Sequence, residues 1–169
     1  MTPETASDTP FRPLTVTPPS TDPAAPLVMR LVRDFGAALV DDTRVADWTA
    51  LPGDRVLLLA GDAVRFPEGQ DVAAVLPELL KVFPDRFEVA AVPRDSEDAV
   101  ARRYGSQRWP SLLFFRSGHY VTAIAGMQDW DVYLASVAAA LAMPPSRPPT
   151  IGIPVVSSQP ATGDDSACH

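Results

Sequence analysis

The stretch 104–126 constrains the fold of this 169-residue chain more than any other segment. Leu112–Phe115 is an unbroken apolar run, long enough for one buried strand, and residues 120–125 resume a strand-like pattern. Between the two, Ser117 and Gly118 provide residues that tolerate the positive φ angle of a two-residue hairpin loop. The sequence therefore predicts a β-hairpin here.

Pro110 stands at the entrance of the first hairpin strand, directly after Trp109. Proline is tolerated at that position because it has no hydrogen bond of the strand ladder to lose. The residue before a proline favours extended backbone, so we expect Trp109 to be extended. A proline permits the cis isomer of the preceding peptide bond, and the sequence leaves the isomer of Trp109–Pro110 open.

Proline usage divides the chain into a domain and two tails. Of the 19 prolines, seven fall in residues 1–26 and six in residues 144–160. We therefore expect a disordered tail over 1–25, one domain over 26–143 and a flexible tail over 144–169. The N-terminal segment has neither the basic start nor the apolar core of a secretory signal, and no run approaches the roughly 20 apolar residues of a membrane span. The expectation is a cytoplasmic protein that is not embedded in a membrane.

The charge and the cysteine content of the chain exclude several classes of function. The net charge is −7, from 21 acidic and 14 basic residues, which disfavours nucleic acid as a partner and favours a basic peptide. Cys168 is the single cysteine, so neither an intrachain disulfide nor a Cys-X-X-Cys pair can form. Two histidines and one cysteine do not supply a standard zinc cluster, and no Gly-rich phosphate loop is present. We expect no metal, no cofactor and no catalytic residue.

Apolar spacing predicts an alternation of helices and strands. The expected helices cover residues 27–35, 42–51, 72–83, 95–104 and 130–141, and the expected strands cover 37–40, 56–60, 87–92 and the hairpin. Residues 56–60 are apolar throughout, which is typical of a central strand covered on both faces. Strands that are separated by helices predict parallel crossovers, and the hairpin adds an antiparallel pair. The fold class is α/β, with three layers α/β/α around a central mixed sheet.

That element order, with a proline opening the strand before the hairpin, resembles the thioredoxin fold. The segment YGSQRWPSLLFFRSGHYVTAIAG is similar to the thioredoxin segment that runs through the cis-proline strand to a late glycine. Thioredoxins carry Cys-X-X-Cys between the first central strand and its helix, which corresponds here to residues 61–70. No cysteine is present there, and disulfide exchange needs an attacking thiolate and a resolving thiol. The scaffold is expected without its redox chemistry.

Four segments, one of which overlaps the hairpin segment, resemble the HyaE/HoxO family of [NiFe]-hydrogenase accessory proteins over about residues 26–150. They are VLLLAGDAVRFPE, LPELLKVFPDRFEVA, ARRYGSQRWPSLLFFRSGHY and GMQDWDVYL. The resemblance implies a non-enzymatic chaperone that binds the hydrogenase small subunit precursor, including its twin-arginine signal peptide, in the cytoplasm before export. It also implies protection of that subunit's metal centres during aerobic growth as a lesser role, and leaves other hydrogenase accessory proteins open as partners.

Two groups of residues are candidates for peptide binding under this resemblance. Arg108, Trp109 and Pro110 would form an edge on which a peptide backbone adds as a short strand. The alternative is that Trp109 is a packing residue and Pro110 a turn constraint.

Acidic residues form the second group. Asp62, Glu68 and Asp71 lie in or beside the loop that replaces the cysteine motif, and would face two consecutive arginines. The alternative is a solvated loop followed by a helix N-terminus, which favours acidic residues by itself.

Two other functions remain open at this point. One is a thiol-dependent redox protein that uses Cys168, next to His169, although a tail offers no pocket to stabilise a thiolate. The other is a generic peptide-binding thioredoxin-like module with a partner unrelated to hydrogenase. His119 lies in the hairpin turn, where we expect it to be exposed.

Overall fold

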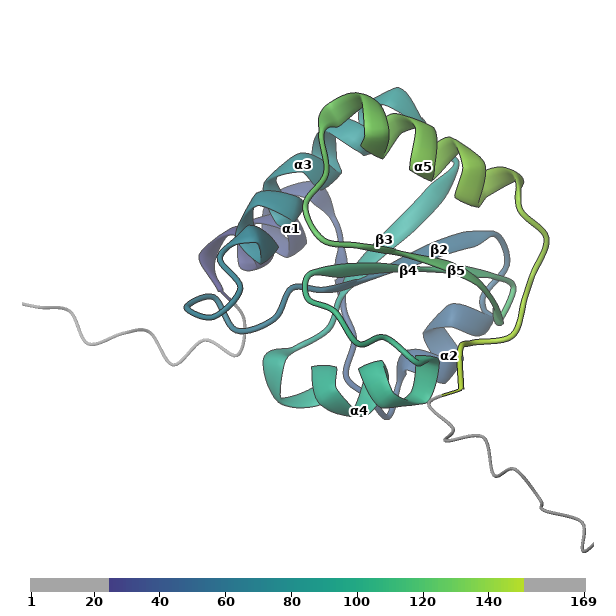
Figure 1. The fold of residues 1–169 in the computed structure, drawn as a ribbon, viewed down its shortest axis with the longest axis horizontal. Coiled ribbons are helices and arrows are strands. Elements are labelled where there is room, and N and C mark those ends of the chain that lie inside the picture. The colour runs from purple at the N-terminus through teal and green to yellow at the C-terminus, as the bar shows by residue number, and fades with distance from the viewer. Residues whose placement is uncertain (1–24, 151–169) are drawn as a thin grey trace, which may run out of the picture.

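The structure, a computed structural model, describes residues 25–150 of the chain. Within these residues, five helices and five strands follow one another in the predicted order. Figure 1 shows how they are arranged. The helices are α1 (Pro26–Phe35), α2 (Val45–Ala50), α3 (Glu68–Val82), α4 (Arg94–Tyr104) and α5 (Trp130–Ala142). The strands are β1 (Ala38–Leu39), β2 (Asp54–Leu59), β3 (Phe87–Ala91), β4 (Ser111–Arg116) and β5 (His119–Ala125).

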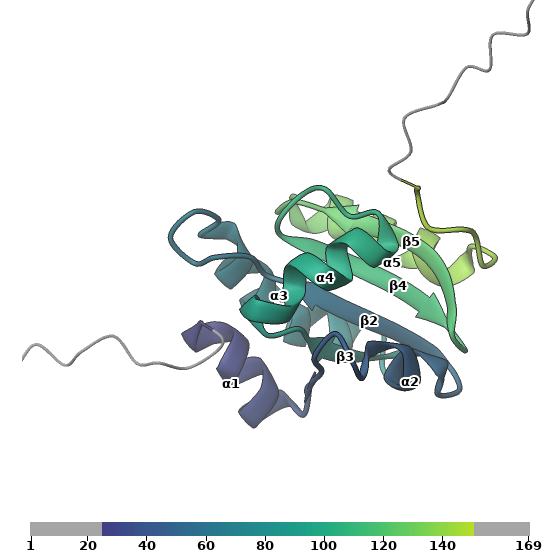
Figure 2. The same cartoon turned by 90° about the horizontal axis from the view of Figure 1, so that it is seen from below.

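The strands form one mixed sheet in the order β1-β3-β2-β4-β5. As predicted, β2 is the central strand, and its residues from Val56 to Leu59 are fully buried. Helices α1, α3 and α5 cover one face of the sheet, and α2 and α4 cover the other (Figures 1 and 2). Each face has its own apolar cluster, so the predicted three-layer α/β/α architecture is confirmed.

The predicted hairpin is confirmed. β4 and β5 pair antiparallel, and the turn between them has positive φ at Ser117 (46°) and at Gly118 (86°). His119, at the start of β5, is exposed as expected. A bulge between Phe114 and Phe115 shifts the register of the pair.

One topological expectation was wrong. The rule of parallel crossovers predicts that β4, which follows α4, runs parallel to its neighbour, but β4 pairs antiparallel with β2. Ser111, the first residue of β4, lies opposite Leu59, the last residue of β2. The connection through α4 therefore returns the chain to the end of the sheet that it left, instead of crossing to the other end.

Two helix starts also differ from the expectation. α3 begins at Glu68 and not at Val72, so the residues from Glu68 to Asp71 form its first turn. α2 begins at Val45 and not at residue 42. The turn before it is capped by Asp41, whose Oδ1 accepts the N–H groups of Thr43 and Arg44 at 3.1 Å each. Apolar spacing missed the first turn of α3 because first-turn residues need not face the core.

After α5, the described chain follows the outer edge of β5. Ser146 donates its N–H to the carbonyl of Tyr120 and its hydroxyl to the carbonyl of Val121, both at 2.7 Å. The division into a domain and two tails stays a prediction, because residues 1–24 and 151–169, and Cys168 with them, lie outside the described residues. Among residues 25–150, no helix is long and apolar enough to cross a membrane.

Candidate peptide-binding site

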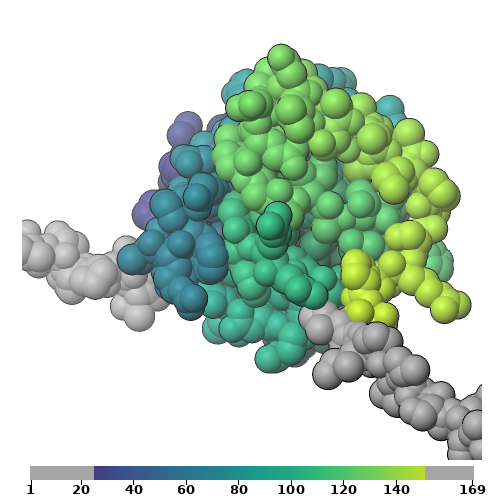
Figure 3. Space-filling view, in the orientation of Figure 1, coloured from purple at the N-terminus to yellow at the C-terminus, as the bar shows by residue number. Residues whose placement is uncertain are grey.

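The candidate site lies at the carboxyl end of β2, where the loop 61–67 meets the loop before β4. The Trp109–Pro110 peptide bond is cis. The ring of Phe66 stacks on that of Trp109, with 5.9 Å between the centroids. The carbonyl of Pro110 accepts the N–H of Gly126 at 2.8 Å, which joins the loop after β5 to the same place. Segments around residues 60–68, 105–110 and 126–130 adjoin on the face seen in Figure 3, and we call them the loop cluster.

Gly61 allows the two loops to approach closely. Its φ is +82°, and a Cβ atom added there would lie 2.8 Å from Cδ2 of Phe66 and 3.0 Å from Cβ of Trp109. Any larger residue would push the two rings away from the end of β2. The close approach of Phe66 and Trp109 thus depends on a glycine.

Asp62 shapes the loop. Its Oδ1 accepts the main-chain N–H groups of Val64 at 3.0 Å and of Arg65 at 2.9 Å, and its carbonyl accepts the N–H of Phe66 at 2.8 Å. These hydrogen bonds to the charged form, from Arg65 first, lower the pKa of the Asp62 carboxyl. Asp62 therefore has a local structural role, whatever it binds.

The structure brings some of the predicted site residues together. Trp109, Pro110 and Asp62 belong to the loop cluster, with Trp109 half-buried and Pro110 buried. Glu68 and Asp71 lie exposed in the first turn of α3, where both complement the helix dipole. Arg108 is exposed and lies beside Trp109.

A buried acid beneath the loop escaped the sequence analysis. Glu97, on α4, is 1% exposed, and both of its carboxylate oxygens accept the N–H of Gly61 at 3.0 Å. Nη1 of Arg94 lies 3.4 Å from Oε2 of Glu97 and 3.0 Å from Oδ1 of Asp98. The detectable signal was spacing: Glu97 is followed at i+3 and i+4 by the buried Val100 and Ala101, so it lies on the inner face of α4.

Burial raises the pKa of the Glu97 carboxyl, and the N–H of Gly61 and the charge of Arg94 oppose that shift. Nε1 of Trp109 is buried and has no hydrogen-bond partner within residues 25–150. The carboxylate of Glu97 thus holds the loop through the backbone of Gly61, and not through the Trp109 side chain.

Apolar side chains are exposed around the loop cluster. Val64 at the tip of the loop is 91% exposed, and Met127 and Trp130, just after Gly126, are 41% and 42% exposed. Among residues 25–150, no group of three or more His, Cys, Asp or Glu side chains could hold a metal ion. The arrangement offers an apolar surface with acidic residues beside it.

The family model described as "Hydrogenase-1 expression protein HyaE" matches residues 27–133. The chain is 54% identical, over 153 residues, to "Hydrogenase expression/formation protein HoxO" from Cupriavidus necator, and the match covers 89% of this chain and 92% of the relative. The chain belongs to the HyaE family. It is also 37% identical over 108 residues to "Hydrogenase expression/formation protein HupG" from Bradyrhizobium diazoefficiens, covering 64% of this chain and 73% of the relative.

The fold of this HyaE family protein is also found in a thioredoxin. A single-residue mutant of the thioredoxin from Halobacterium salinarum aligns with a TM-score of 0.51 at 23% identity, covering 62% of this chain and 90% of the thioredoxin. The thioredoxin-like fold and the HyaE/HoxO resemblance are therefore confirmed. In this HyaE family protein the loop 61–67 contains no cysteine.

Proposed function

We propose that this HyaE family protein is a non-enzymatic accessory protein of [NiFe]-hydrogenase maturation, which binds the twin-arginine signal peptide of the small subunit precursor at the loop cluster. Its family is one of hydrogenase expression/formation proteins, which supports the role in maturation. The observation that supports the binding role is the cis Trp109–Pro110 bond beside a loop that has no thiol. We take this place as the edge on which a peptide would dock.

The main chain at Trp109 supports the addition of an extended peptide. Within residues 25–150, neither the N–H nor the carbonyl of Trp109 has a main-chain partner, whereas the carbonyl of Pro110 is taken by Gly126. A peptide that runs past Trp109 can therefore pair with it as a short strand, and its side chains would meet the rings of Phe66 and Trp109.

Charge supports a basic peptide. Asp62, Glu68 and Asp71 lie on one side of the edge, and the exposed Asp129 and Asp131 lie on the other, at the start of α5. All of these carboxylates except the half-buried Asp62 are exposed, although Arg94 and Arg65 already act on the charge of Asp62. Paired arginines on the peptide would gain bidentate contacts with carboxylates, which give orientation as well as attraction.

The proposal places the protein in the cytoplasm, because the precursor carries its leader only before export. Release of the precursor would follow cofactor insertion and subunit pairing. Protection of the small subunit's metal centres and contacts with other hydrogenase accessory proteins are further roles that this location would allow.

The test measures the Kd of the full chain for a synthetic leader peptide across a salt series. Glu68→Lys should weaken binding roughly two- to tenfold at low salt, since an exposed ion pair is worth about 0.2–1 kcal/mol and reversal adds repulsion. The difference in Kd between Glu68→Lys and the unmodified chain should shrink at about 1 M salt, where the Debye length is about 3 Å. Glu78→Lys, a matched charge reversal about 15 Å further along α3, should change little.

Asp62→Asn separates the two roles of Asp62, because asparagine keeps an oxygen for the N–H groups of Val64 and Arg65 but removes the charge. Weaker binding by a variant with unchanged stability would support a contact with arginine. A leader with both arginines replaced by glutamine should bind more weakly than the native one. Equal affinity of the two leaders would contradict the proposal.

A further inference from the structure

Among the described residues, three of the five residues of β3 have no strand on the outer edge of the sheet. β1 pairs with β3 only at Ala38 with Ala90 and at Leu39 with Ala91. Within residues 25–150, no strand pairs with the outer side of β3 from Phe87 to Val89. The opposite edge of the sheet differs, because Ser146 hydrogen-bonds to β5 there. The free edge lies at the other end of the sheet from the loop cluster.

The direction of the main chain shows which groups are free. The N–H of Val92 donates to Leu58 of β2, and the carbonyl of Ala91 accepts the N–H of Val40 on the outer side. Main-chain groups alternate between the two sides of a strand, so those of Phe87 and Val89 point outward, as those of Ala91 do. Within residues 25–150, the N–H and carbonyl of Phe87 and the N–H of Val89 therefore have no main-chain partner on that side.

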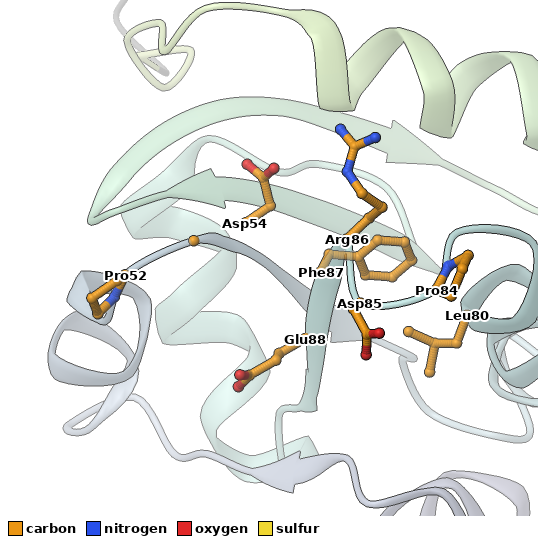
Figure 4. Close-up of a pocket in the computed structure, with 9 residues that line it drawn as sticks. Pro52, Asp54, Leu80, Pro84, Asp85, Arg86, Phe87 and Glu88 are labelled. Carbon is orange, nitrogen blue, oxygen red and sulfur yellow. The ribbon is translucent and has the colours of Figure 1, made fainter.

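A groove runs along this free edge. It consists of two adjoining cavities of about 500 and 240 Å³, whose linings share Leu80, Phe87 and Glu88. Figure 4 shows the larger cavity, with Leu80 and Pro84 on one side of the start of β3 and Pro52 on the other. An edge of three residues is about 10 Å long, which is enough for three or four residues of a docked strand.

The walls of the groove define what it can accept. Phe35, which is 40% exposed, and Leu80 make one wall apolar, and Trp48 lines the other. The charges along it are balanced. Glu88 pairs with Arg55 at 2.7 Å and Asp54 with Arg116 at 2.6 Å, and the remaining Asp85 and Arg86 are neighbours of opposite sign. A strand that docks in the groove would therefore find main-chain hydrogen-bond partners and apolar side chains, in surroundings whose charges cancel.

We infer that the groove beside Phe87–Val89 binds an uncharged extended segment of a partner protein, which continues the sheet in line with β1 by strand addition. The partner is the hydrogenase small subunit precursor, bound through a segment outside its leader, so this inference rests on the proposed function. The six residues of β2 separate the groove from the loop cluster by roughly 20 Å, so one long polypeptide can occupy both sites.

The test measures amide hydrogen exchange in the full chain alone, with the synthetic leader peptide, and with the small subunit that lacks its leader. Exchange at Phe87 and Val89 should slow at least tenfold with the leaderless subunit and stay unchanged with the leader peptide. Ala90, whose N–H points towards β2, is the internal control. Unchanged exchange at Phe87 and Val89 with the leaderless subunit would overturn the inference, and so would strong protection already present in the free chain.

A pair of variants separates this site from the loop cluster. Phe35→Glu places a charge in the apolar wall and should weaken binding of the leaderless subunit roughly tenfold, while the affinity for the leader peptide is unchanged. Met143→Glu, at a side chain that is similarly exposed (41% against 40%) but does not line the groove, should change neither affinity. Equal effects of the two variants would contradict the inference. If the unmodified chain did not bind the leader peptide at all, this result would instead contradict the proposed function.

Discussion

Glu97 and Gly61 are joined across the core by a carboxylate that accepts one main-chain N–H with both oxygens, each at 3.0 Å. This contact links α4 to the loop that holds Phe66 against Trp109. A buried carboxylate is costly in its charged form and useful as an acceptor, so the contact both supports the site and makes its stability depend on pH.

Glu97→Gln should flatten that pH dependence. Burial raises the pKa of Glu97 above its ordinary value of 4.5, so the native state holds this proton more tightly than the unfolded chain does. The contribution of protonated Glu97 to the stability of the folded state is fully present below pH 4.5. It is lost as the pH rises through the raised pKa of Glu97. Urea unfolding of both proteins should be measured from below pH 4.5 upward. The free energy of unfolding of the wild type should fall as the pH rises, and that of the variant should not. Parallel curves would show that Glu97 does not titrate in this range.

Gly69→Ala should destabilise the protein strongly, because a Cβ atom there would collide with the carbonyl oxygen of Ala60 at the end of β2. Gly36→Ala is the matched control: its φ is +73° but no heavy atom lies within 4 Å of the added Cβ. Gly36→Ala should lower the free energy of unfolding by about 1–2 kcal/mol, because of backbone strain. Gly69→Ala should lower it by more, because the backbone must move to admit the Cβ atom. Denaturant unfolding measures both. A larger loss at Gly36 would contradict the close packing of α3 on β2.

Tyr133→Phe tests how the loop after β5 is held. The hydroxyl of Tyr133, a residue only 1% exposed, donates to the carbonyl of Gly126 at 3.0 Å, and the N–H of Gly126 donates to Pro110. Burial raises the pKa of Tyr133 to about 12, so the phenol keeps its proton throughout the physiological range. The variant should lose about 0.5–1.5 kcal/mol of unfolding free energy, independently of pH between about 6 and 9. Faster amide exchange at Gly126 would show that the loop has loosened.

The sequence predicted the elements that local patterns specify. The run Leu112–Phe115 with the turn at Ser117 is enough to define the hairpin, and the apolar run of β2 is enough to place it centrally. It did not predict that β4 runs antiparallel to β2, because this depends on where the connection through α4 ends. It also missed Glu97, since an acid in the first turn of a helix has an ordinary explanation in the helix dipole.

The free edge of β3 could not be predicted either. Residues 37–40 read as a strand, but only Ala38 and Leu39 pair, and the length of a ladder depends on where the chain leaves the sheet. The roles of Arg108, Trp109, Pro110, Asp62 and Glu68 in peptide binding stay predictions. What the structure adds is that Trp109 lies against Phe66, and that Asp62 shapes the loop through hydrogen bonds to its backbone.

The cysteine-free loop makes a further prediction, which distinguishes an accessory protein from a thiol enzyme. Cys168 is the only cysteine of the chain, so a mixed disulfide formed on it has no second thiol in the same molecule to resolve it. We expect no reduction of insulin by the full chain with dithiothreitol above the rate of dithiothreitol alone, and no change in Cys168→Ser. The same two proteins should bind the leader peptide with equal affinity. Insulin reduction that disappears in Cys168→Ser would instead favour a redox function, because a thiol would then be required for activity.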